Sequence, residues 1–291
     1  MTWFWLALCC ALLTACCDAV SKRIVRTNDE WVAGTVLVGI ACLLLTPVFL
    51  AQDLKPVSLD FILLLAVALP LEILAYYLFL SAIRSGPLSL TVPLLAFTPV
   101  LTILSSALIV GERISSTGAV RIALVTSGAY LLNGDLARSG LLDPLRALVS
   151  HAGSRRMLAV AVVWAVTSAL GKKGVLMYGA IPFGTVLTYG VLVGFAAISF
   201  VRMQREPKRG RFDRKLWGFY LLGGLFMGAA QITHFLAISM APVAYMLSVK
   251  RLSLVFGVML GWLCVGEGNM RYRLTAAAVM VVGVLFIYDM P

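Results

Sequence analysis

Residues 82–87 read Ala-Ile-Arg-Ser-Gly-Pro, and residues 237–242 read Ala-Ile-Ser-Met-Ala-Pro. The two stretches are 155 residues apart, and the same shift superposes Val-Gly-Glu at 110–112 on Val-Gly-Glu at 265–267 without a gap. Chance rarely gives a constant offset that aligns a proline, a glycine and a glutamate among apolar residues. We therefore predict that the chain contains an internal repeat.

The composition places this repeat in a membrane. Of the 291 residues, 61% are hydrophobic and only 13% are charged, which leaves too little polar surface for a soluble domain of this length. The charges crowd into short stretches between apolar runs of about 18–24 residues, the length that crosses roughly 30 Å of hydrocarbon. These runs lack the alternation of a β-barrel, so each is predicted to be a helix. The ten predicted spans are 3–21, 31–50, 59–83, 88–110, 117–134, 156–178, 183–201, 215–239, 243–265 and 273–289.

The spans divide into two halves. Residues 1–134 form the first repeat, residues 135–155 form a linker whose leucines suggest a short amphipathic helix, and residues 156–291 form the second repeat. Because each half has five spans, the second half must enter the membrane in the opposite sense. The predicted fold is an all-α integral membrane protein with ten transmembrane helices in two inverted five-helix repeats. Many secondary transporters are built in this way, with the solute path between the halves.

The positive charge predicts an orientation. The net charge is +11, but the basic residues lie in loops between spans, so anionic lipid headgroups are the expected partner and nucleic acid is not. Nearly all of them share one face, and the other face has little beyond Lys55 and Arg113. The positive-inside rule places the basic face in the cytoplasm and both termini outside it.

The repeated pattern resembles the EamA repeat of the drug/metabolite transporter superfamily. Ala-x4-Pro, then a span ending in Gly-Glu, then a span of small residues occurs twice, from Ala82 and from Ala237. The resemblance covers nearly the whole chain. It implies ten helices, alternating access and export or exchange of a small solute, and it leaves the substrate open. Ten-helix relatives usually keep both termini in the cytoplasm, which is opposite to the orientation that the charges predict.

One dipeptide resembles a motif of a particular branch of this superfamily. Lys250-Arg251 in the ninth span resembles the Lys-Arg pair of the plastid triose-phosphate/phosphate translocators, which holds the substrate's phosphate in that branch. The pair lies seven or eight residues inside its span, roughly 10–12 Å along the helix. A charge at this depth is costly unless it faces water, a partner or a ligand, so we predict that both residues bind an anionic group of the solute. The alternative is that both side chains extend back to the nearer interface.

Two further helices bring basic groups to the same depth. Lys172 and Lys173 lie in the last third of the sixth span and His234 lies towards the end of the eighth, on the side that Lys250 and Arg251 approach. We predict that they join the binding site. An interfacial anchor is the alternative for the two lysines, and a packing role is the alternative for the histidine.

The repeat and the acidic residues supply the remaining candidates. Polar positions that coincide under the 155 shift are predicted to line a cavity shared by the halves: Tyr76 with Gln231, and Thr98 with Ser253. Glu72 in the third span is a candidate carrier of a coupling proton, because burial favours the neutral form of a carboxyl group. Pairing with a lysine is its alternative. Asp18 lies near the predicted end of the first span, where an interfacial role is expected.

Motifs of other functional classes are missing from the sequence. It has no P-loop, no H-E-x-x-H, no G-x-S-x-G and only two histidines, so we expect neither an enzyme nor a metal site, a cofactor or an ATP-driven pump. The prediction is a multi-pass secondary transporter of the cell (inner or plasma) membrane for a small, anionic or phosphorylated metabolite, with a homodimer considered as its assembly. The alternatives are a flippase for a lipid-linked headgroup and a non-transporting scaffold subunit. A scaffold has little reason to keep charges inside its spans.

Overall fold

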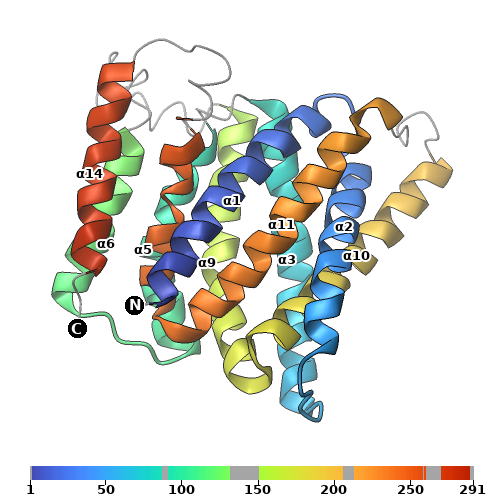
Figure 1. The fold of residues 1–291 in the computed structure, drawn as a ribbon, viewed down its shortest axis with the longest axis horizontal. Helices are drawn as coiled ribbons and strands as arrows, with labels where there is room; N and C mark the ends of the chain where they lie inside the picture. The colour runs from blue at the N-terminus through green and yellow to red at the C-terminus, as the bar shows by residue number, and fades with distance from the viewer. Residues whose placement is uncertain are drawn as a thin grey trace.

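The structure, a computed structural model, describes residues 2–86, 91–131, 151–205, 213–257, 259 and 270–288. Within these ranges all regular secondary structure is helical, as Figure 1 shows. The amphipathic helix expected in the linker falls almost entirely outside the described residues. The helices of the first half are α1 (Thr2–Val25), α2 (Glu30–Leu50), α3 (Leu59–Ser85), the 3₁₀ helix η1 (Val92–Ala96), α5 (Phe97–Ile109) and α6 (Ser116–Leu131). Those of the second half are α9 (Ala152–Tyr178), α10 (Ala180–Arg205), the 3₁₀ helix η2 (Arg214–Leu216), α11 (Trp217–Met240), α12 (Val243–Lys250) and α14 (Met270–Tyr288).

Each of the ten predicted spans overlaps helical residues of the structure. Among the described residues, seven helical segments are long and apolar enough to cross a membrane: α1, α2, α3, η1 with α5, α9, α10, and η2 with α11. The chain is therefore a multi-pass membrane protein. The count of ten crossings stays a prediction, because α6, α12 and α14 do not meet that standard over the residues described.

Short polar side chains set where two of the helices begin. The carboxylate of Asp29 accepts a hydrogen bond of 2.9 Å from the backbone N–H of Trp31, and α2 starts at the residue between them. The hydroxyl of Ser58 accepts one of 3.2 Å from the N–H of Phe61 at the start of α3. Both satisfy donors that have no partner within the first turn of a helix.

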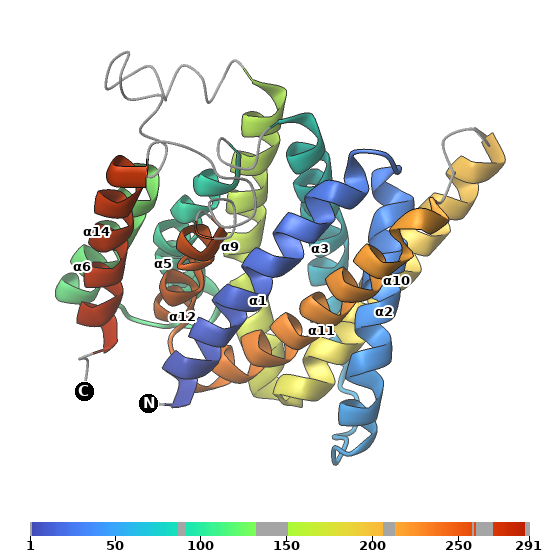
Figure 2. The same ribbon diagram turned by 45° about the horizontal axis from the view of Figure 1, so that its top comes forward.

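The two halves pack against each other more than within themselves. The most extensive helix pairs are α1 with α11, α3 with α9, α6 with α14, α2 with α10, α2 with α11 and α5 with α9, and each joins one half to the other. Since α1 corresponds to α9 and α3 to α11, exchanging the halves turns the first pair into the second. Figures 1 and 2 show α1 running away from the side that carries both termini and α9 running back towards it. The buried centre of the molecule is thus the boundary between the halves.

Candidate functional site

A cavity of about 150 Å³ lies at this boundary. Side chains from α1, α3, α9, α10, α11 and α12 line it, so both halves contribute. Its ionisable lining residues other than cysteine and tyrosine are Asp18, Glu72, His234, Lys250 and Arg251. Its largest apolar side chains include Phe79, Trp164, Phe235, Leu187 and Met227.

The five ionisable residues share the cavity without direct ion pairs. Asp18 on α1 lies within electrostatic range of Lys250 and Arg251, and Glu72 on α3 lies within range of Lys250. Within the described part of the chain, none of the five has an ion-pair partner within 4.0 Å. Buried charges are usually paired, so this arrangement leaves charges of both signs available to a ligand.

An interruption of the helix places the two basic residues. Helix α12 ends at Lys250, and Arg251 with Leu252 form a turn before helical residues resume at 253. The backbone N–H of Leu252 donates to the carbonyl of Val249 at 3.0 Å, and that of Leu254 to the carbonyl of Arg251 at 3.0 Å, which is 3₁₀ geometry.

The corresponding position in the first half lies at a change of helix geometry. The 155 shift places Arg251 on Ala96, where the 3₁₀ helix η1 ends and α5 begins without a break. In both halves, 3₁₀ geometry therefore occurs at the same level of the repeat.

Two buried side-chain atoms of the cavity have no hydrogen-bond partner. Arg251 is 4% exposed and His234 is 9% exposed. Among the described residues, neither Arg251 Nε nor His234 Nδ1 has a partner. Leaving such atoms unpaired is costly, and more than nine in ten buried polar groups in proteins are bonded. Both atoms are therefore positioned to contact a ligand.

Two predicted residues of α3, Glu72 and Tyr76, line the cavity. The carboxyl group of Glu72 interacts with the side chains of Thr167 and Trp164 on α9. The hydroxyl of Tyr76 donates to the sulfur of Met227 on α11 at 3.7 Å. Gln231, the counterpart of Tyr76 under the 155 shift, lines the same cavity. The repeat thus identified one pair of lining positions.

The second pair and the two neighbouring lysines lie elsewhere. Thr98 and Ser253 are buried but do not line the cavity. Lys173 is exposed. Lys172 is buried, and its ammonium group donates to the carbonyl oxygen of Ile238 at 2.6 Å and lies 4.0 Å from the carboxylate of Glu112. These lysines were predicted to join the binding site only because of their depth in the sixth span. Neither lines the cavity, and they are not part of the site proposed below.

Asp18 is the residue that sequence reasoning misplaced. The predicted first span ended at residue 21, but α1 continues to Val25, so Asp18 is about 10 Å from the helix end and faces the cavity. The extra turn is held from within the protein. Lys22 donates to the carbonyl oxygens of Ile83 and Gly86 at the end of α3.

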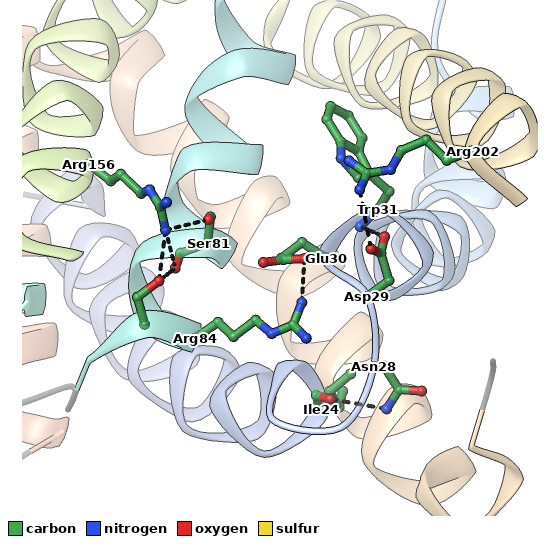
Figure 3. Close-up of polar contacts among 10 residues, drawn as sticks. Ile24, Asn28, Asp29, Glu30, Trp31, Ser81, Arg84, Arg156 and Arg202 are labelled. Atoms are coloured by element: carbon green, nitrogen blue, oxygen red, sulfur yellow. Dashed lines mark hydrogen bonds and ion pairs between the residues drawn. The ribbon is translucent and has the colours of Figure 1, made fainter. Parts of the chain in front are cut away.

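A separate set of polar contacts joins the halves at the ends of α3 and α10 and the starts of α2 and α9 (Figure 3). Arg156 of α9 donates to the hydroxyl oxygens of Ser81 at 2.9 Å and Ser85 at 2.7 Å on α3. Arg202 of α10 lies 3.9 Å from the carboxylate of Asp29. These contacts lie outside the cavity lining and link the ends of these helices.

The described residues contain no group of three or more His, Cys, Asp or Glu side chains that could hold a metal ion. The candidate site consists of charged, polar and apolar side chains around a small cavity.

Comparisons with known proteins agree with the repeat. No curated protein sequence matches the chain. One solved structure, described only as the crystal structure of a protein, matches 99% of this chain and 96% of the other with a TM-score of 0.75 and 16% identity, which shows the fold alone. The model of the EamA-like transporter family matches residues 1–134 and 154–289. The chain therefore belongs to the EamA-like transporter family and is a membrane transporter of the drug/metabolite type.

Proposed function

We propose that the chain is a secondary transporter that carries a small solute with an anionic group across a cell membrane by alternating access. The observation that carries the proposal is the cavity between the halves, where Lys250 and Arg251 lie at a helix interruption without an ion-pair partner among the described residues. A carboxylate or phosphate is the natural partner for a guanidinium beside an ammonium group.

The volume of the cavity limits the size of the solute. A cavity of about 150 Å³ accepts a small organic molecule, since an engineered protein cavity of that volume binds benzene. A small carboxylate or phosphorylated metabolite meets this limit. Arg251 Nε and His234 Nδ1 would gain partners when such a solute binds.

Alternating access would follow from the symmetry of the halves. The constant 155 shift, the reciprocal packing of α1 on α11 and α3 on α9, and the opposite directions of α1 and α9 support ten helices in two inverted five-helix repeats. If each half adopts either of two conformations, exchanging them would open the cavity to the opposite face. A proton or counter-solute gradient would drive the cycle, with Glu72 as the candidate proton carrier.

The test begins with binding. Thermal-shift measurements on the purified full chain would screen inorganic phosphate, glycerol phosphate and small carboxylates, and proteoliposome counterflow would follow for each compound that binds. We expect Arg251→Lys to weaken binding of the identified anion, because the charge stays but the bidentate fork is lost. Arg251→Ala should weaken it further, by about tenfold to a hundredfold relative to the wild type.

The control is Lys173→Ala, which removes an exposed charge outside the cavity. It should bind and transport as the wild type does. If correctly inserted Lys250→Ala and Arg251→Ala proteins transported the identified solute at normal rates, the assignment of the site would be wrong.

A further inference from the structure

We infer that the cavity binds a zwitterion, with Asp18 holding a cationic group of the same solute whose anionic group Lys250 and Arg251 hold. The inference rests on the proposed function and specifies its substrate class. It starts from the charges that face the cavity, which are of both signs.

A site for a simple anion should not include carboxylates. Asp18 and Glu72 both line the cavity together with Lys250 and Arg251. An ionised carboxylate at Asp18 would repel an anion bound at Arg251. A solute that brings its own cationic group removes this repulsion.

The spacing of the charges supports a bridging ligand. Asp18 on α1 is within electrostatic range of Lys250 and Arg251, and α1 packs against α12. Yet the carboxylate of Asp18 makes no hydrogen bond or ion pair with any other residue that the structure describes. Opposite charges that share a small cavity without direct contact leave room for a molecule carrying the complementary pair. Bound in this way, a zwitterion would give both poles a partner and leave the net charge of the site unchanged.

The remaining lining indicates the body of the solute. Phe79, Trp164, Phe235 and Leu187 cover the cavity with aromatic and aliphatic surface. An apolar side chain would be held there by the hydrophobic effect. A small zwitterion with an apolar part matches the lining better than a sugar does, because the hydroxyl groups of a sugar would lose hydrogen bonds to water against these walls.

Matched probes separate the two charges. The full-length protein would be titrated with L-leucine, which carries both charges, N-acetyl-L-leucine, which keeps only the anion, and L-leucinamide, which keeps only the cation. A parallel set of phosphoethanolamine, methyl phosphate and ethanolamine replaces the carboxylate by a phosphate. Each probe would be measured by thermal shift and calorimetry on the wild type and on Asp18→Asn. The control variant is Asp53→Asn, an exposed carboxylate in the connection between α2 and α3.

We expect the zwitterion of at least one set to bind about tenfold or more tightly than either singly charged analogue. Asp18→Asn should remove most of this difference while leaving binding of the anion-only analogue unchanged or stronger, and Asp53→Asn should behave as the wild type. Equal affinity for the zwitterion and the anion, or a zwitterion affinity that Asp18→Asn leaves unchanged, would overturn the inference. Either result would leave the proposed anion transporter intact, provided that Arg251→Ala still lost binding of the anion. Failure of both zwitterions to bind would also overturn the inference.

Discussion

At the scale of single residues, a substitution of Glu72 can distinguish proton coupling from solute binding. Its carboxyl group lines the cavity and interacts with Thr167 and Trp164 on α9, so it touches both the solute space and the second half. Glutamine keeps nearly the same shape and stays polar, but it cannot exchange a proton. We therefore predict that Glu72→Gln abolishes uptake driven by a pH gradient and retains exchange of solute across proteoliposomes.

The matched control is Asp60→Asn, an exposed carboxylate on the same helix. It should leave both activities unchanged. Normal gradient-driven uptake by Glu72→Gln would show that the proton is carried elsewhere.

Single residues of the site differ in how well their positions could be predicted from the sequence. The depth of Lys250 and Arg251 in an apolar span indicated that they face something polar, and both line the cavity. Lys172 has comparable depth but faces the end of α11. Position along a helix follows from counting residues, whereas the direction of a side chain around the helix depends on the neighbouring helices. Asp18 was misplaced because the apolar run ends before its helix does.

At the scale of elements, the structure contains two corresponding lysine caps. Lys22 of α1 donates to the carbonyl oxygens of Ile83 and Gly86, at 2.5 Å for the latter, where α3 ends. Lys172 of α9 donates at the end of α11 to the carbonyl of Ile238, which is Ile83 shifted by 155 residues. The last carbonyl groups of a helix have no partner within the helix, so each lysine satisfies acceptors that would otherwise be buried and unpaired.

The capping role of Lys172 can be tested by comparing its substitution with that of the neighbouring Lys173. Lys172→Met keeps the length of the side chain but leaves the carbonyl acceptors at the end of α11 without a donor. We expect a loss of about 1–3 kcal/mol in unfolding free energy, seen as a lower Tm of the purified protein in detergent. Lys173→Met, one residue along and exposed, should change Tm little. Equal Tm values for the two variants would contradict a capping role.

Close packing of α11 on α2 depends on glycine. A Cβ added at Gly224 would lie 2.5 Å from the Cβ of Ile40 and 3.0 Å from the carbonyl oxygen of Leu37. Because one of these neighbours is backbone, the helices would have to separate. We predict that Gly224→Ala destabilises the protein by about 1–3 kcal/mol in thermal unfolding. Gly218→Ala on the same helix has nothing within 4 Å of the added Cβ and serves as control. A Tm for Gly224→Ala no lower than that of Gly218→Ala would show that α11 can move at little cost.

The elements themselves were largely predictable, since apolar runs bounded by charges locate helices in a membrane chain. The interruption after Lys250 was not predicted. Residues 243–257 contain no proline or glycine before Gly257 to signal it. In the first half, Pro93 and Pro99 flank the equivalent change from η1 to α5, and there the sequence does give a local reason.

At the scale of the whole molecule, the repeat predicted that the halves correspond, but not how they pack. The pairing of α1 with α11 and of α3 with α9 exchanges when the halves exchange. This arrangement brings carboxylates from α1 and α3 into one cavity with Lys250 and Arg251 and builds the cavity from both halves. A sequence shift contains no information on such contacts, because they depend on shape complementarity between helices distant in the chain.

The distribution of charge over the molecule leads to the final prediction. Both termini lie on one side (Figure 1). Arginines 84, 156 and 202, which Figure 3 shows close together, lie at the end of α3, the start of α9 and the end of α10, on the other side. In the sequence, the connections at that second face also carry most of the remaining basic residues. Positive charge is retained in the cytoplasm during membrane insertion, so this face should be cytoplasmic and both termini external. Reporter fusions at Pro291 would measure the orientation, because alkaline phosphatase is active outside the cytoplasm and green fluorescent protein fluoresces inside it. We expect an active phosphatase fusion and a fluorescent-protein fusion that does not fluoresce. The reverse pair of results would place the termini in the cytoplasm, as in most ten-helix relatives. It would mean that the charge bias does not set the orientation of this chain.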